Sequence, residues 1–291
     1  MVNKKIIEQN LDAWSQSPFD KETISKVHKL KDTNNEDFND SFYTDLSFGT
    51  GGMRGVVGVG PNRVNKYTFG RNTQGISNYI NKHSSNESES VVIAYDCRND
   101  SKYLAKQVAD TFSANNIKVY LFDSIRPTPE LSYAVVKLNC ICGIVLTASH
   151  NPPEYNGYKV YWKDGGQIVP PIDKNLINEI NSTDYSKINF DRNESLIEII
   201  GEEIDNQFIK DSILNGKVGD SNREDYKIVF TPLHGTSHKI LPEVLKGAGY
   251  TDLHTVKEQE IPDGNFPTVK SPNPEEPEAL KMAIALARDI D

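Results

Sequence analysis

CICGIVLTASHNPPEYNGYKVYWK, residues 140–163, is the stretch of sequence that decides the fold of this chain. Residues 140–146 are apolar with only Gly143 interrupting them, which is the pattern of a strand buried on both faces. Pro152 and Pro153 follow and prevent the chain from continuing as a regular strand or as a helix interior. Ser149 is therefore predicted to lie on a stiff loop at the end of a core strand, where open α/β sheets build active sites.

Elements of alternating type surround this stretch and predict the fold class. The expected strands are residues 91–95, 118–122, 140–146 and 157–162, and the expected helices are 4–14, 21–30, 68–81, 101–115, 126–138 and 170–180. Residues 31–40 and 181–193 are polar and are expected to be connections. This order predicts an α/β fold with a mixed, mainly parallel sheet and helices on both faces.

Length and element order predict two domains, residues 1–200 and 201–291, since 291 residues suffice for two cores. Beyond residue 200 the same element order returns. The expected helices are 202–215, 239–247 and 277–288, and the expected strands are 227–230 and 253–256. Only three residues follow the last helix, where a further strand is expected. We therefore expect a second domain of the same class that is truncated.

Composition narrows the class of partner. The formal net charge of −9 disfavours nucleic acid but permits a small phosphorylated ligand held by a few local cations. No segment approaches the roughly 18 apolar residues of a membrane span, and the N-terminus lacks the apolar core of a signal peptide. We expect a cytoplasmic protein that binds neither membrane nor nucleic acid.

Residues 49–55, GTGGMRG, form a second stretch suited to chemistry. Its four glycines let backbone amides approach a ligand closely, and Arg54 adds a positive charge with a planar fork of donors. The stretch fits a phosphate-binding nest that includes Gly51 and Gly52, and it fits a flexible turn equally well. Its spacing matches neither the dinucleotide-binding fingerprint nor a P-loop, so both interpretations stay open.

Asp96 and Arg98 follow the strand predicted over residues 91–95. In a parallel sheet these two residues lie at the same edge as Ser149, which makes them candidates for the same site. The alternative is a local ion pair that closes the turn.

Ser149 carries the chemistry that distinguishes the candidate functions. A serine hydroxyl needs a base, a metal or a prior modification to react, and His150 is poorly placed as a base because neighbouring side chains in an extended segment diverge. The G-x-S-x-G pattern of serine hydrolases is missing around it, which disfavours that class. As a phosphoserine it would carry about −1.5 to −2 charge, which needs cations nearby. The candidates are Arg54, Arg98, Lys159 and His150, and a plain turn residue remains the alternative for Ser149.

These motifs resemble those of the α-D-phosphohexomutase superfamily, which includes the phosphoglucomutases and phosphomannomutases. TASHNPPEYNGYKVY, from residue 147, resembles the family's phosphoserine loop. GTGGMRG, RPTPE at residue 126, TPLHGTSH at 231 and DGNFPTVKSPNPEEPEAL at 263 occur in the family's order. The resemblance covers nearly all of the chain and is closest to the phosphoglucomutase/phosphopentomutase branch.

The resemblance implies a role for each matching residue. Ser149 would be the phosphorylated serine, and its phosphate would also be a ligand of the catalytic Mg²⁺. Lys159 would lie near the transferring group, and His150 would position substrate and assist proton transfer. The residues expected to bind substrate or phosphate are Arg54, Gly51, Gly52, Asn151 and Arg98.

The activity implied is that of an isomerase which interconverts hexose 1-phosphate and hexose 6-phosphate through a bisphosphorylated sugar. Family members also carry an Asp-rich Mg²⁺-binding loop, a third domain that recognises the sugar hydroxyls and a fourth domain with a phosphate-binding motif. None of these features occurs in this sequence. We therefore expect a fragment with little activity alone, whose partners are a phosphorylated sugar and the missing C-terminal domains. The alternative is a non-catalytic fragment that binds a phosphorylated ligand or a partner protein.

Overall fold

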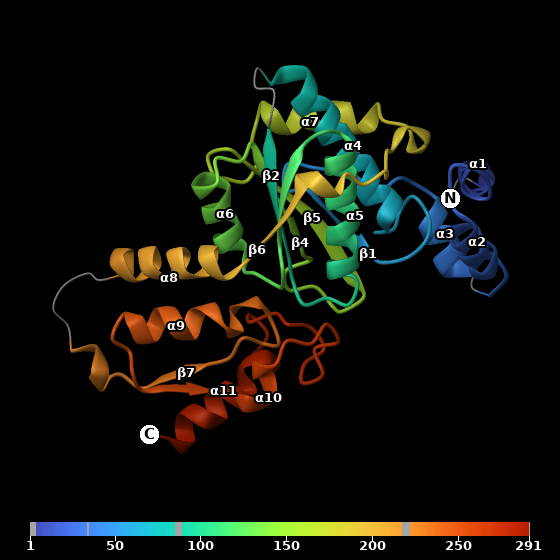
Figure 1. The fold of residues 1–291 in the computed structure, drawn as a ribbon. Helices are drawn as coiled ribbons and strands as arrows, with labels where there is room; N and C mark the ends of the chain where they lie inside the picture. Colours follow the sequence, from blue (N-terminus) through green and yellow to red (C-terminus); the bar gives the residue numbers. More distant parts are fainter. Residues whose placement is uncertain (1–3, 34, 85–88, 217–221, 291) are drawn as a thin grey trace.

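The computed structural model describes residues 4–33, 35–84, 89–216 and 222–290. A larger α/β unit is built on a six-stranded sheet, and a smaller unit with a two-stranded sheet lies beside it (Figure 1). No helix within the described ranges is long and apolar enough to cross a membrane.

The six-stranded sheet has the order β1-β5-β4-β2-β3-β6. Its strands are β1 Met53–Val56, β2 Ser90–Tyr95, β3 Lys118–Phe122, β4 Cys142–Leu146, β5 Tyr155–Trp162 and β6 Ile197–Ile200. The pairs among β4, β2, β3 and β6 are parallel, whereas β5 is antiparallel to both β4 and β1. The predicted mixed, mainly parallel sheet is confirmed. The strand β6 was not predicted, because its four residues, three isoleucines and one glutamate, are too short a run to identify as a strand without the pairing with β3.

Helices cover both faces of this sheet, as predicted. Val91 and Ile93 of β2 point into a core shared with α4 Lys66–His83, α5 Ser101–Ala114 and α7 Ile172–Asn181. Val92 and Ala94, the alternate residues, point into a second core under α6 Thr128–Lys137. Figure 1 shows α5 and α6 on opposite sides of the strands.

The N-terminal helices form a separate small cluster on the large unit (Figure 1). They are α1 Lys4–Trp14, α2 Lys21–Thr33 and α3 Asn35–Phe42. The prediction of a connection over residues 31–40 is wrong, since α2 runs to Thr33 and α3 begins at Asn35. Phe38 and Phe42 lie four residues apart and are both buried in this cluster, which makes the otherwise polar segment helical.

The smaller unit contains the parallel pair β7 Ile228–Phe230 and β8 Leu253–Thr255. Its helices are α8 Glu202–Gly216, α9 Ile240–Gly247, α10 Lys257–Glu260 and α11 Pro277–Asp289, and it has single 3₁₀ turns at Arg223–Asp225 and Thr236–His238. Two further 3₁₀ turns, Tyr185–Lys187 and Glu194–Leu196, lie in the larger unit before β6. The expected domain boundary at residue 200 falls between β6 and α8 and stays a prediction.

A buried ionic group joins the two units. The guanidinium of Arg126 donates to both carboxylate oxygens of Asp205 on α8, at 2.6 and 3.0 Å. Lys239 also donates to Asp205, at 2.8 Å. Glu130 on α6 is fully buried with its Oε1 3.7 Å from Nε of Arg126. The Arg126–Asp205 pair is buried and fixes one geometry, so it holds α8 beside α6, and the exposed Lys239 adds a contact from the start of α9.

Candidate active site

The site lies where two neighbouring parallel strands end. Ser149 follows β4, Asp96 and Arg98 follow β2, and the two strands are paired in parallel register. The chain leaves β2 toward β3 on one side of the sheet and leaves β4 toward β5 on the other. Such a point, where the connections diverge, opens a crevice at the carboxyl edge of a sheet, which is where α/β proteins bind ligands.

Ser149 has an unusual backbone conformation. Its φ is +56°, in the left-handed region that residues other than glycine, asparagine and aspartate rarely adopt. Its amide donates to Oγ1 of Thr147 at 2.9 Å, and the amide of Asn151 donates to the carbonyl of the fully buried Ala148 at 3.1 Å. These bonds hold the turn while the serine side chain stays exposed. A strained residue that is held in place in this way suits a functional site.

The buried side chain of Arg98 holds the Ser149 turn through hydrogen bonds. Its side chain is 1% exposed, and all five N–H donors meet protein oxygens. The acceptors are the carboxylate of Asp96 and the carbonyls of Ser149, Asn151, Pro152 and Tyr155, at 2.7–3.2 Å. Burial lowers the pKa of Arg98, and the charge of Asp96 opposes that shift. The local ion pair of Arg98 with Asp96 is therefore present, and Arg98 also contacts the Ser149 loop. Binding of phosphate by Arg98 stays a prediction, and its five N–H donors are already taken by protein oxygens.

Lys159 reaches the serine from the neighbouring antiparallel strand. β5 places Lys159 opposite Val145 of β4, and its Nζ donates to Oγ of Ser149 at 3.0 Å. Burial lowers the pKa of Lys159, and the charge of Arg54 lowers it further. The lysine is thus a partly desolvated cation whose hydrogen-bond partner is a neutral hydroxyl.

Arg54 lies on β1, the next strand along. It is exposed and donates to Oδ1 of Asn151 at 2.7 Å, so it contacts the serine loop through the side chain of Asn151. The structure therefore brings Ser149, Asn151, Lys159, Arg54 and Arg98 together. Such a group of cations around an exposed hydroxyl is suited to an anion that is attached to, or approaches, that hydroxyl.

The glycine-rich stretch before β1 is a closed turn. Gly49 and Gly52 exchange backbone hydrogen bonds at 2.8 and 2.9 Å, and Gly52 has φ +95°. Thr50 donates to the buried carboxylate of Asp173 at 2.7 Å, and Gln167 donates to the carbonyl of Gly51 at 3.0 Å. The stretch is therefore a turn, as one of the two interpretations held, and its central residues Thr50 and Gly51 are tied to Asp173 and Gln167. Contacts of Gly51 and Gly52 with a phosphate stay predictions.

His150 is exposed beside Ser149, and its carbonyl accepts a hydrogen bond from the hydroxyl of Ser271 in the smaller unit. The sequence analysis missed this contact and also the tie between Thr50 and Asp173. Nothing in the sequence links residues that lie 121 and 123 positions apart, so only the folded chain reveals them.

The described residues do not by themselves suit a Mg²⁺ ion. No three His, Cys, Asp or Glu side chains among them are grouped so as to hold a metal. Asp96, the acid that follows β2, already accepts from Arg98 and from the hydroxyl of Ser101 at 2.7 Å. Mg²⁺ prefers several oxygen ligands, and a phosphate on Ser149 would add only its own oxygens.

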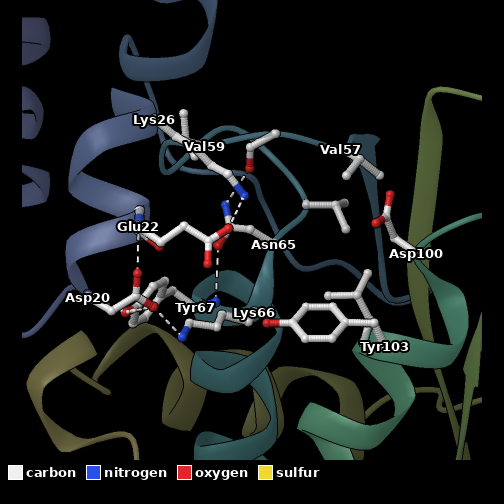
Figure 2. A pocket seen from close by; sticks show the side chains of 14 residues that line it. Asp20, Glu22, Lys26, Val57, Val59, Asn65, Lys66, Tyr67, Asp100 and Tyr103 are labelled. Carbon is white, nitrogen blue, oxygen red and sulfur yellow. Dashed lines mark hydrogen bonds and ion pairs between the residues drawn. The ribbon is translucent and has the colours of Figure 1, made fainter. Parts of the chain in front are cut away.

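A separate pocket of about 200 Å³ lies between α2, the loop after β1 and the first turns of α4 and α5 (Figure 2). Lys66 pairs with Asp20, and Lys26 pairs with Glu22 at 2.7 Å. Figure 2 shows Tyr103 pointing across it toward Lys66. The lysines here already have acidic partners, in contrast to Lys159, and none of the predicted site residues lines this pocket.

Comparison with known proteins agrees with the fold and the motifs. Residues 45–187 match the family model described as phosphoglucomutase/phosphomannomutase, alpha/beta/alpha domain I, and residues 206–291 match domain II of the same family. A phosphoglucomutase of Staphylococcus haemolyticus is 41% identical over 254 residues, which are 86% of this chain and 46% of the relative. A phosphoglucomutase of Staphylococcus epidermidis is 38% identical over 261 residues, 88% of this chain and 47% of the relative.

Solved structures agree on the fold. A putative phosphomannomutase from Thermus thermophilus superposes with a TM-score of 0.68 at 22% identity, over 84% of this chain and 52% of that one. The pp63/parafusin phosphoglucomutase of Paramecium, in an open form, gives 0.57 at 19% identity, over 80% of this chain and 46% of that one. The chain spans about half the length of the curated relatives it matches.

Proposed function

Because the chain belongs to the phosphoglucomutase/phosphomannomutase family, we propose that it is part of a sugar phosphomutase that interconverts hexose 1-phosphate and hexose 6-phosphate. The observation that carries the proposal is the 3.0 Å contact between Nζ of Lys159 and Oγ of Ser149, made by a half-buried cation whose pKa is lowered. A phosphate on Ser149 would give this cation the negative partner that it lacks.

In the proposed reaction Ser149 carries the phosphoryl group. The free hydroxyl of the sugar phosphate attacks phosphorus and gives up its proton, the bond from phosphorus to Oγ breaks, and a bisphosphorylated sugar forms. The released Oγ of Ser149 is stabilised by the hydrogen bond that Lys159 donates to it. After this sugar turns over, its other phosphoryl group returns to Ser149. Lys159 and Arg54 offset the charge that spreads over the phosphoryl oxygens during each transfer. His150, exposed beside the serine, is the proposed acceptor of the hydroxyl proton.

Asn151, Gly51 and Gly52 are proposed to complete the phosphate contacts. The family is generally Mg²⁺-dependent, and a phosphate on Ser149 would offer the hard oxygen ligands that this ion prefers. The remaining ligands are proposed to come from parts of the whole protein beyond residues 1–291. We extend the proposal to the domain division at residue 200, to a cytoplasmic location, and to little turnover by residues 1–291 alone.

The test is intact-mass measurement after incubation with glucose 1,6-bisphosphate. We expect the chain to gain one phosphate and the Ser149→Ala variant to gain none. Binding of the bisphosphate without any covalent gain would favour the alternative, a non-catalytic fragment that binds phosphorylated ligands. Labelling of Ser149 by an acyl-serine probe would favour a hydrolase instead and would overturn the proposal.

A further inference from the structure

A loop of the smaller unit lies directly against the candidate active site. We call residues 261–271 the Phe266 loop, after the residue whose ring stacks on Arg98 with its centre 5.2 Å from the guanidinium carbon. Asn265 accepts from the side chain of Asn99 at 2.9 Å, and Ser271 donates to the carbonyl of His150. The loop thus contacts residues that follow β2 and residues that follow β4.

Close packing shows how tightly the Phe266 loop is seated. A Cβ atom on Gly264 would lie 2.7 Å from both the carbonyl oxygen of Cys97 and the amide nitrogen of Asn99. That separation is far below van der Waals contact, so only glycine permits the approach. The loop is therefore fitted to the turn that carries Arg98.

The Phe266 loop is also rigid within its own unit. His234 is 3% exposed, and its two ring nitrogens lie 3.0 Å from the carbonyl of Ile261 and 2.9 Å from Oγ1 of Thr268. Phe266 has φ +48° and is 3% exposed. A bulky residue is strained in the left-handed region, so the surrounding contacts must hold it there.

Arg98 connects this loop to the serine. The edges of its guanidinium donate to the carbonyls of Ser149 and Asn151 at 3.1 and 2.7 Å, while its face carries the ring of Phe266. An aromatic ring on that face attracts the cation and keeps water away from it. Hydrogen bonds strengthen when water is excluded, so the ring supports the bonds that hold the left-handed turn at Ser149.

We propose that Phe266 is a positioning residue for the phosphoryl-transfer site: through Arg98 it holds the Ser149 loop in its reactive conformation. Ser271 adds a second tether through the carbonyl of His150. The part of this inference that concerns catalysis rests on the proposed function. The part that concerns the geometry of the loop does not, and the two are tested separately.

The experiment compares Phe266→Leu, which keeps apolar volume, with Phe266→Tyr, which keeps the ring face. Ile261→Ala is the matched control, since Ile261 lies in the same loop but is 74% exposed. Amide hydrogen exchange is followed for the peptide of residues 147–157, and Ser149 phosphorylation is followed with glucose 1,6-bisphosphate. In Phe266→Leu we expect exchange in this peptide to rise roughly tenfold, in line with a desolvated cation–π contact. Phe266→Tyr and Ile261→Ala should exchange like the wild type.

Phosphorylation provides the second readout. The maximal rate should fall in Phe266→Leu and recover in Phe266→Tyr. The bisphosphate concentration giving half the maximal rate should stay unchanged, because Arg54 and Lys159 are intact. Faster exchange in Phe266→Leu would support the positioning role even if the whole wild-type protein were not phosphorylated, an outcome that would contradict the proposed function. Wild-type exchange and a wild-type rate in Phe266→Leu would overturn the positioning role.

A second variant keeps the proposal testable if Phe266→Leu fails to fold. If exchange in the α4 peptide shows that Phe266→Leu is unfolded, Ser271→Ala decides the matter, because that side chain is only half-buried. Faster exchange at residues 149–151 in Ser271→Ala, with α4 unchanged, supports the proposal. Unchanged exchange there overturns it.

Discussion

The ammonium group of Lys159 lies 3.0 Å from the hydroxyl of Ser149, although a lysine drawn out of water is normally found beside a carboxylate. The contact exists because β5 returns antiparallel to β4 and brings Lys159 level with the end of that strand. Arg54 stands on the next strand and lowers the pKa of Lys159 further. Two cations, Lys159 and Arg54, therefore lie close together beside the Ser149 loop, and the hydrogen bond from Lys159 goes to a neutral hydroxyl.

Replacing this lysine tests its role in charge stabilisation. Lys159→Met should slow phosphorylation of Ser149 by roughly 100-fold, the usual scale for removing one preorganised donor from a developing anion. Lys163→Met is the control, since Lys163 is an exposed lysine just beyond the same strand. Equal rates of phosphate gain in the two variants, followed by mass spectrometry, would contradict a role for Lys159 in transfer.

Arg98→Lys separates shaping of the loop from binding of phosphate by charge. Lysine keeps the charge but cannot reach four carbonyls and a carboxylate, so we expect a loss of at least about 2 kcal/mol of stability from unsatisfied buried groups. Arg54→Lys, at an exposed position, should change stability by less than about 0.5 kcal/mol. Urea unfolding measures the change in the free energy of unfolding for both variants. A fully stable Arg98→Lys protein would show that the hydrogen bonds of the guanidinium are dispensable.

Gly52 and Gly51 provide a matched pair for the turn before β1. Gly52 has φ +95°, and a Cβ there would lie 2.0 Å from the carbonyl oxygen of Tyr158. Gly52→Ala should therefore destabilise the protein by roughly 3 kcal/mol or more. A Cβ on Gly51 meets only the end of Gln167, at 3.7 Å, so Gly51→Ala should fall within about 1 kcal/mol of the wild type. Similar unfolding midpoints for the two variants would contradict the fixed turn.

Stability should fall with rising pH because of Glu130. Burial, and then the neighbouring carboxylate of Asp205, raises the pKa of Glu130 from 4.5 to about 8. The folded state therefore binds a proton that the unfolded state has lost, and this contribution is complete below pH 4.5 and disappears as pH rises through about 8. In that window the free energy of unfolding should fall by up to about 1.4 kcal/mol per pH unit.

Glu130→Gln removes this titration while keeping the side-chain shape. Urea unfolding at pH 5, 6, 7 and 8 should give a steep decline for the wild type and a flatter line for the variant. The lowered pKa of Asp205 acts in the opposite direction and only toward acid, where stability is lost as that carboxylate is protonated. Parallel lines for the two proteins would show that Glu130 is already ionised.

Much of the fold was predictable from local pattern. β3 matches its predicted bounds, and the parallel core follows from the alternation of strands and helices. What escaped prediction depends on distant partners. β6 is a strand because β3 is beside it, and α3 is a helix because Phe38 and Phe42 reach an aromatic cluster.

The same distinction holds for the site. The composition of the Ser149 loop pointed to its place at a strand end, and the antiparallel β5 explains why Lys159 lies nearby. The stacking of Phe266 on Arg98 joins two units of the chain that are far apart in sequence, and no local pattern encodes it. Roles in phosphate chemistry were suggested by the motifs and stay predictions until Ser149 is tested directly.

The most direct test of the central claim is to locate the phosphate and follow its departure. After the whole protein that contains residues 1–291 has been incubated with glucose 1,6-bisphosphate, fragmentation mass spectrometry should place a single phosphate on Ser149. Addition of glucose 6-phosphate should then remove it and form glucose bisphosphate. A phosphate on another residue, or one on Ser149 that glucose 6-phosphate leaves in place, would contradict the account.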